Sequence, residues 1–258
     1  MNHIVLSKRE NVGYITLNRA PANAYNLDLM TELHQAVVDM NADSSVGALV
    51  VNSQSEKFFC AGADIKEFQT NDTATNQKLV DMARRTTAAL EQSDKVVIAQ
   101  VSGHALGGGL ELIMACDLRF AAKGNYLLGL PEIKLGLIPG NGGSQRLVRL
   151  VGLAKALEFL ATGDSFSVNT ATEMGLINQL VEKDQLDQFT FEYAKKIADG
   201  PLLAVTATKK ALRQGVELTL EEGLALEQKL VNELYDTKDA AEGFNAFIDK
   251  RPAVFQGQ

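Results

Sequence analysis

Two glutamates in apolar surroundings are the residues of this sequence most able to do chemistry. Glu111 stands between Leu110 and Leu112 in the segment GHALGGGLE, and Glu132 follows Pro131 in LGLPEIKLG. An ionised carboxylate is unusual among apolar residues unless it has a partner or a purpose. Two such groups together could serve as a general acid and a general base.

Three consecutive glycines, Gly107 to Gly109, lie just before Glu111. The apolar run Val96–Val101 precedes them and predicts a buried strand, and the residues after them predict a buried helix over 108–116. Glycines at this junction let other atoms approach the backbone, and the first turn of a helix leaves N–H groups unpaired. Such an arrangement favours an anion or a developing oxyanion. A structural alternative stays open at this point, with Gly108 as an N-cap residue and Glu111 as half of a capping box.

A second segment of small residues, Ala61 to Ala63, lies in the stretch CAGADIKEF. It also precedes a predicted short helix, so its N–H groups are expected to be accessible. Asp64 and Glu67 have the spacing of a capping box, and we expect Asp64 to cap this helix rather than to do chemistry.

The loop GLIPGNGGSQRL, residues 136–147, is rich in glycine and contains Pro139. It predicts a tight turn, with Gly142 or Ser144 at the start of the next helix. The loop lacks the Lys-Ser/Thr ending of a P-loop, and no G-x-G-x-x-G fingerprint follows the strand that begins at Lys95. The sequence therefore disfavours a P-loop and a dinucleotide-binding fold.

Short strands and helices alternate along the first 200 residues, which predicts a layered α/β or α+β core. The strands are predicted at residues 4–9, 12–18, 47–52, 95–101, 118–121, 126–128 and 178–181. Besides the helix that carries Glu111, helices are predicted at about 28–40, 77–92, 154–161, 168–174 and 185–198.

Gly200-Pro201 is a strong break, and we expect a domain boundary there. Three helices are predicted beyond it, at 202–214, 219–235 and 238–249. The last one carries two phenylalanines on one face, Phe244 and Phe247, which favours packing on another subunit. Packing on the core of the same chain is the alternative.

Composition and charge restrict the possible partners. A net charge of −7 argues against extended contact with nucleic acid, which needs a basic surface. No apolar run approaches the roughly 18 residues of a transmembrane helix, and the first residues lack a signal-peptide core, so we expect a cytoplasmic protein without membrane contact. Cys60 and Cys116 lie in apolar surroundings, where we expect buried, unreactive thiols and no disulfide. The three histidines have no metal-ligand spacing.

These motifs together resemble the enoyl-CoA hydratase/isomerase, or crotonase, family. The resemblance spans nearly the whole chain in the expected order, which is far more specific than any single motif. It is carried by the segments NRAPANA, CAGADIKEF, GHALGGGLELIMACD, PEIKLGLIPGNGGSQRL and AEGFNAFIDKR.

The resemblance implies an α/β fold in which β-β-α turns form a spiral over residues 1–200. Residues 201–258 would form a C-terminal helical region for oligomerisation. The expected assembly is a homo-oligomer, a trimer or a hexamer made of two trimers. No metal, flavin or nicotinamide cofactor is implied, because CoA is part of the acyl-CoA thioester substrate.

By the same resemblance, Glu111 and Glu132 occupy the two catalytic carboxylate positions. The backbone N–H groups of Ala63 and Gly108 would form the oxyanion hole for the thioester carbonyl. The remaining residues of the substrate and CoA site would be Ala61, Asp64, Ile65, Lys66, Pro131 and Gly140. Lys66, Lys250 and Arg251 are candidates for contact with the CoA phosphates.

Because this sequence has both family carboxylates, Glu111 and Glu132, the resemblance favours syn addition of water to a trans-2-enoyl-CoA. The product would be the 3-hydroxyacyl-CoA of fatty-acid or branched-chain degradation. Glu111 would mainly hold and deprotonate the water, and Glu132 would protonate the α-carbon, although a shared water lets the two exchange duties. Alternatives are 3,2-enoyl-CoA isomerisation, methylglutaconyl-CoA hydration, or a non-catalytic CoA-binding relative. Asn141 and Leu130 depart from the common family pattern at the acyl pocket, so acyl chain length is left open.

Overall fold

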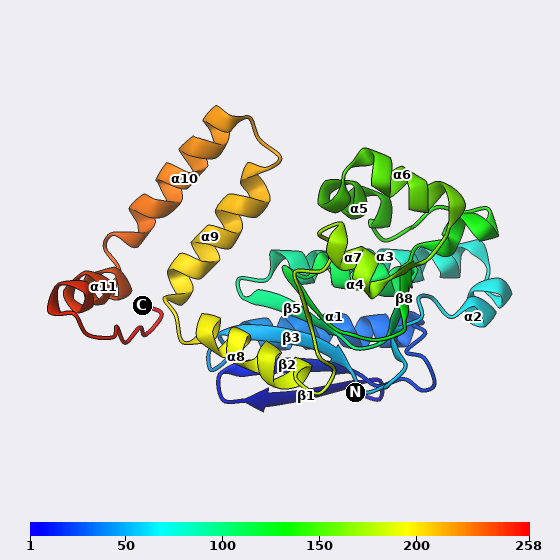
Figure 1. Cartoon of the computed structure of the whole chain (residues 1–258), viewed down its shortest axis with the longest axis horizontal. Helices are drawn as coiled ribbons and strands as arrows, with labels where there is room; N and C mark the ends of the chain where they lie inside the picture. The colour runs from blue at the N-terminus through cyan, green and yellow to red at the C-terminus, as the bar shows by residue number, and fades with distance from the viewer.

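A six-stranded mixed sheet forms the largest layer of the protein, whose computed structural model describes all 258 residues (Figure 1). Its order is β1-β2-β3-β5-β7-β10. The first two strands pair antiparallel as a hairpin, and every later pairing in the sheet is parallel. The strands are β1 (Ile4–Arg9), β2 (Val12–Leu17), β3 (Ala48–Ser53), β5 (Val96–Val101), β7 (Leu118–Ala122) and β10 (Gln179–Val181).

A second sheet has four short strands in the order β4-β6-β8-β9. They are β4 (Phe58–Cys60), β6 (His104–Leu106), β8 (Leu127–Gly129) and β9 (Phe166–Ser167). Each turn of the chain adds one strand to the large sheet and the next strand to the small one, as in β3-β4, β5-β6 and β7-β8. Helices return the chain after the first two of these pairs, so the chain winds as the expected spiral of β-β-α turns.

The large sheet is buried on both faces because its side chains alternate between two cores. Val12, Tyr14 and Val50 point to the face covered by α8 (Leu186–Ala198). Their neighbours along the strands, such as Ile15, point to the main core. In the figure α8 runs along this sheet, on the side away from α5 and α6 (Figure 1).

The remaining helices of the spiral contribute to the main core or extend from it. They are α1 (Leu27–Ala42), α2 (Ile65–Thr70), α3 (Thr73–Gln92), α4 (Gly108–Ala115), the 3₁₀ helix η1 (Pro131–Leu135), α5 (Gly143–Val151), α6 (Leu153–Thr162) and α7 (Val168–Glu173). Every residue of α4 is buried, and both free cysteines, Cys60 and Cys116, are buried in the same core. None of the helices is both long enough and apolar enough to cross a lipid bilayer.

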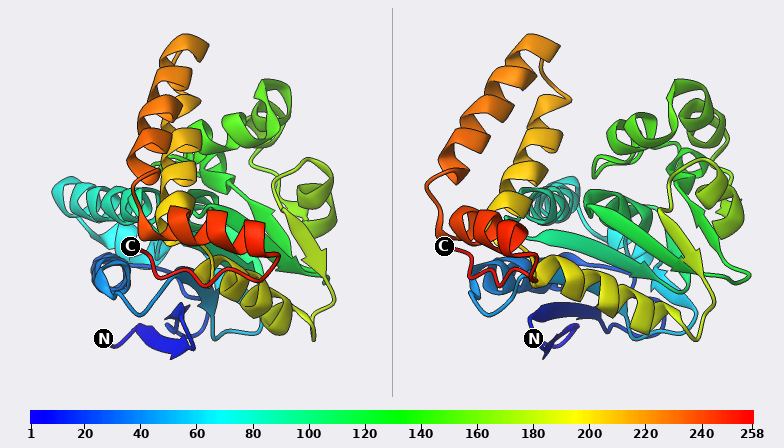
Figure 2. Two further views of the ribbon diagram at one scale, coloured as in Figure 1. Left: turned by 90° about the vertical axis from the view of Figure 1, so that its left-hand side faces the viewer. Right: turned by 60° about the vertical axis from the view of Figure 1, so that its left-hand side comes forward.

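Three helices follow Gly200-Pro201: α9 (Leu202–Gly215), α10 (Leu220–Leu234) and α11 (Lys238–Asp249). The first two lie side by side and project away from the sheets in both views (Figure 2). The side chain of Phe247 is 86% exposed and that of Phe244 is 62% exposed. The alternative prediction, that this apolar face packs on the core of the same chain, is therefore wrong.

Most predicted elements are confirmed to within a few residues, including the hairpin, the helix expected at about 28–40 and the three C-terminal helices. Three short strands were not predicted, β4, β6 and β9. Asp64 is the N-cap residue of α2, as expected, but its side chain makes no cap hydrogen bond, so the capping box with Glu67 is wrong. Asp64 instead pairs with Arg19 at 3.0 Å, and Glu67 pairs with the same arginine at 3.1 Å.

The approach of α4 to β4 gives a test of the packing. A methyl group at Gly109 would stand 2.1 Å from the carbonyl oxygen of Cys60, which is backbone and cannot move aside. We expect Gly109→Ala to lower the free energy of unfolding in urea by about 1–3 kcal/mol. Gly215→Ala, in α9 with nothing within 4 Å, should raise it by up to about 1 kcal/mol. Equal stability of the two variants would contradict this packing.

Candidate active site

Glu111 is a buried carboxylate held by main-chain donors. Its side chain is on α4, and the residue is only 2% exposed. Its Oε1 accepts hydrogen bonds from the backbone N–H groups of Asn141 at 2.8 Å and Gly143 at 2.7 Å. The N-cap residue of α4 is Gly107, so the structural alternative of a capping box between Gly108 and Glu111 is wrong. The carboxylate points into the 136–147 loop rather than back to its own helix.

Glycine is needed where the loop meets this carboxylate. A methyl group on Gly143 would lie 2.9 Å from Glu111 Oε1. The preceding residue, Gly142, has φ +90° and is the N-cap of α5, which matches one of the two predicted starts of that helix. This backbone conformation is strained for other residue types. The glycines of the loop therefore allow two N–H groups to converge on one oxygen.

Glu132 lies on the other side of the glycine segment. It is the second residue of η1, directly after Pro131, and a methyl group on Gly107 would stand 2.9 Å from its Oε1. Its Oε2 is buried and has no hydrogen-bond partner. Burial and the nearby charge of Glu111 raise the pKa of Glu132 to about 7.

The two carboxyl groups have unequal surroundings. Burial raises the pKa of Glu111 as well, but the N–H groups of Gly143 and Asn141 and the charge of Arg146 oppose this rise. Hydrogen bonds to the charged form favour ionisation, and Glu132 receives none from another side chain. The site thus places a buried carboxyl group whose anionic form is stabilised by two N–H donors near a second carboxyl group whose protonated form is favoured by burial.

The predicted backbone donors come from two adjacent segments. Ala63 forms a parallel bridge with Tyr25, in which Tyr25 N–H donates to Gly62 at 2.8 Å and Asp64 N–H donates to Tyr25 at 2.8 Å. The N–H of Ala63 takes no part in this bridge and donates to no other backbone group. Gly108 is the first residue of α4, so its N–H has no acceptor within the helix. A methyl group on Gly62 would lie 3.4 Å from the Gly108 nitrogen, which places the two segments side by side.

The other predicted site residues surround these groups. Ala61 donates its N–H to the carbonyl of Ala22 at 3.0 Å, and the carbonyl of Gly140 accepts from Arg84 Nε at 2.8 Å. Ile65 is 54% exposed at the start of α2, and the next residue, Lys66, is also exposed.

The two C-terminal candidates for contact with CoA phosphates differ. Arg251 is paired with Glu242 at 2.7 Å, whereas Lys250 is exposed. The pairing occupies the guanidinium of Arg251 within its own chain.

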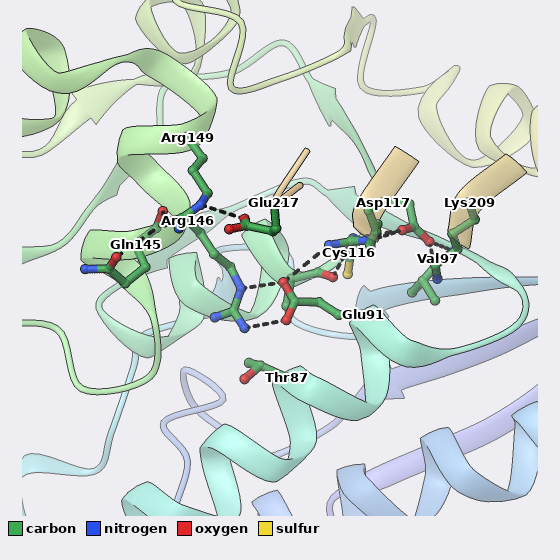
Figure 3. Close-up of polar contacts among 12 residues, drawn as sticks. Thr87, Glu91, Val97, Cys116, Asp117, Gln145, Arg146, Arg149, Lys209 and Glu217 are labelled. Carbon is green, nitrogen blue, oxygen red and sulfur yellow. Dashed lines mark hydrogen bonds and ion pairs between the residues drawn. The ribbon is translucent and has the colours of Figure 1, made fainter. Parts of the chain in front are cut away.

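An ion-pair network behind Glu111 was missed by the sequence analysis. Arg146 donates to the carbonyl of Asn141 at 2.7 Å and forms two bonds with Glu91, at 2.7 and 2.8 Å (Figure 3). Arg213 of α9 reaches Glu91 at 3.3 Å and Asp117 at 2.8 Å. These residues are far apart in sequence and look like ordinary surface charges, so no local signal could have found them.

This network lines a cavity of about 1010 Å³ between α9 and the spiral. Neither Glu111 nor Glu132 is among its lining residues, so this cavity is separate from the candidate chemistry. The network ties the loop that holds Glu111 to α3 and α9.

Comparison with known proteins places this geometry in a family. The sequence model of the enoyl-CoA hydratase/isomerase family matches residues 7–258. The chain belongs to this family. The crotonase fold then accounts for the two mixed sheets and the C-terminal helices described above.

Relatives and solved structures agree on the family. The chain is 37% identical to the short-chain-enoyl-CoA hydratase of Clostridium acetobutylicum, over 97% of this chain and 96% of that protein. It is 38% identical to the 2,3-dehydroadipyl-CoA hydratase of Escherichia coli, over the full length of both. The crystal structure of an enoyl-CoA hydratase from Bacillus anthracis matches with a TM-score of 0.96 at 38% identity, covering 99% of this chain and 100% of that one.

The raised pKa of Glu132 predicts how the stability of the folded protein depends on pH. Since this pKa is about 7 in the folded protein and near 4.5 for an unperturbed glutamate, the folded state binds more protons between these pH values. The fold is therefore stabilised below about pH 4.5 and loses that stabilisation as pH rises through 7. We expect Glu132→Gln to melt at a higher temperature than the natural protein at pH 8, with a smaller difference at pH 5.

Differential scanning calorimetry at the two pH values would measure this effect. Glu56→Gln, at an exposed position, serves as the control and should show no such pH-dependent difference. A Glu132→Gln protein that is less stable than the natural one at pH 8 would contradict the assigned environment.

Proposed function

We propose that this protein is an enoyl-CoA hydratase, which adds water across the double bond of a trans-2-enoyl-CoA to give the 3-hydroxyacyl-CoA. The observation that carries the proposal is a pair of carboxyl groups in unequal surroundings, Glu111, which is buried, and Glu132, which is partly buried, next to two unpaired backbone N–H groups. The hydratase names of the relatives at 37–38% identity support it.

The backbone donors supply the first part of the chemistry. Addition of water at the β-carbon moves negative charge onto the thioester oxygen. The N–H groups of Ala63 and Gly108 would both donate to this oxygen and so stabilise the enolate-like transition state more than the ground state. Loss of one such donor typically costs about 10²- to 10³-fold in rate.

The unequal carboxyl groups supply the second part. Glu111, whose carboxylate form is stabilised by two N–H donors, takes a proton from water as the water oxygen bonds to the β-carbon. Glu132, with a pKa of about 7, delivers its proton to the α-carbon. Two titratable groups whose surroundings push them toward different protonation states can divide acid and base duties in this way.

The CoA part of the substrate would follow the segment from Ala61 to Lys66. Lys66 is exposed and forms no ion pair, so its ammonium group is available to a CoA phosphate. Pro131 and Gly140 would line the acyl side of the site, near the two glutamates. The relatives include a short-chain-enoyl-CoA hydratase and a 2,3-dehydroadipyl-CoA hydratase, so the proposal is made for trans-2-enoyl-CoA substrates as a class.

Hydration is tested directly by the loss of the conjugated thioester absorbance when the purified protein meets crotonyl-CoA and longer enoyl-CoAs. We expect turnover by the natural protein, and losses of about 10²- to 10⁴-fold for Glu111→Gln and for Glu132→Gln, because each removes one general acid or base. Circular dichroism would confirm that both variants remain folded.

Two outcomes would overturn this assignment. Full hydration by either variant would remove that glutamate from the mechanism. Conversion of a 3-enoyl-CoA to the 2-enoyl-CoA without any hydration would instead favour the isomerase reaction.

We also propose that residues 1–200 form the catalytic spiral and that residues 201–258 hold a trimer, or a hexamer of two trimers, together. The exposed phenylalanines of α11 support this proposal, because exposed apolar faces of this kind are common at subunit interfaces.

The assembly is tested by placing charges on α11. We expect the double variant Phe244→Asp/Phe247→Asp to form smaller oligomers than the natural protein, because a carboxylate cannot be buried unpaired in an apolar interface. Light scattering coupled to gel filtration would measure the mass. Asn245→Asp adds charge to an exposed position of the same helix and should leave the mass unchanged. An unchanged mass in the double variant would contradict the proposed interface.

A further inference from the structure

Tyr25 is fitted against the segment that carries the predicted oxyanion donor. It lies two residues before α1 and is only 6% exposed. A methyl group on Gly108 would stand 2.0 Å from the Tyr25 hydroxyl oxygen and 2.4 Å from its ring, so the phenol fills the space left by the missing side chain of Gly108. The hydroxyl therefore lies one helical turn before Glu111 on α4.

The phenol hydroxyl has no partner of its own. Neither a backbone nor a side-chain hydrogen bond contributes to its environment. Burial raises its pKa well above the ordinary value, and the neighbouring ionisable groups of Glu111, Cys60 and Glu132, on α4, β4 and η1, raise it further. The group stays protonated across the physiological range and is a hydrogen-bond donor throughout.

The site also contains an unpaired acceptor. Glu132 Oε2 is buried without a hydrogen-bond partner. Buried polar groups in native proteins are almost always paired with the chain, with water or with a ligand. The start of α4 thus has a phenol donor beside one residue, Gly108, and a carboxyl group with an unpaired oxygen beside its neighbour, Gly107, and neither group is hydrogen-bonded to another side chain.

We propose that the Tyr25 hydroxyl donates a hydrogen bond to the water molecule that adds to the substrate, so that Tyr25 is a third catalytic side chain. This rests on the proposed hydration. The water gives one proton to Glu111, accepts from Tyr25 with one lone pair, and bonds to the β-carbon with the other. In the reverse reaction the C–O bond breaks, the oxygen leaves with the electron pair, and Glu111 returns its proton. The tyrosine stabilises that oxygen while it is negatively charged.

The test compares two reactions in Tyr25→Phe, which keeps the ring against Gly108 and removes only the hydroxyl. Hydration of crotonyl-CoA uses the water, whereas exchange of the α-protons of butyryl-CoA in D₂O uses only the oxyanion donors and Glu132. We expect kcat for hydration to fall about 10- to 100-fold, as for loss of a hydrogen bond to a charged group. KM should change less than about threefold, and α-proton exchange, followed by NMR, should change less than about twofold.

Tyr14→Phe is the matched control, since Tyr14 is 7% exposed and packs in the separate core under α8. It should leave both reactions unchanged. Equal loss of hydration and exchange in Tyr25→Phe, or a marked fall in its melting temperature, would overturn the proposal in favour of a structural role beside Gly108. Unchanged hydration would also overturn it. If the natural protein hydrates no enoyl-CoA, the proposed function fails first, which this comparison reveals before any variant is made.

Discussion

A buried carboxylate that accepts two main-chain N–H groups is the interaction on which the rest of the structure depends. Glu111 cannot stay ionised in the core without donors from the 136–147 loop, because desolvation alone favours its neutral form. The loop in turn keeps its shape through Gly142 and through Arg146, which holds the carbonyl of Asn141 and is itself fixed by Glu91. Residues of α3 and α5 that do not take part in the proposed chemistry thereby fix the position of the Glu111 carboxylate.

Burial raises the pKa of the second glutamate as well, but there few donors oppose the rise. Glu132 lies on a short 3₁₀ helix after β8, where no main-chain donor from another element reaches it. Its pKa rises to about 7, while Glu111 is held toward its anionic form by its donors. The spiral brings the two together because successive turns end at the same edge of the small sheet, where β6 leads into α4 and β8 leads into η1.

Much of this arrangement could be predicted from residue types. The apolar runs around Val96 and Leu110 located β5 and α4, and the glycines located the close approaches. Strands β4, β6 and β9 were missed because such short strands cannot display an alternating pattern. The capping box at Asp64 failed because Arg19, distant in sequence, offers that carboxylate a stronger, charged partner. Tyr25 and Glu91 carried no local signal, since their roles arise only from packing between distant segments.

The burial of both cysteines has a consequence for an enzyme of this kind. Conjugated enoyl thioesters are electrophiles that react with thiolates at the β-carbon. Cys60 directly precedes the segment assigned to the CoA ester, yet burial raises its pKa, and that of Cys116, to about 12. Both sulfurs thus remain protonated and poorly nucleophilic. The core thereby protects the protein from covalent inactivation by its own proposed substrates, even though the Cys60 thiol lies next to the segment assigned to CoA.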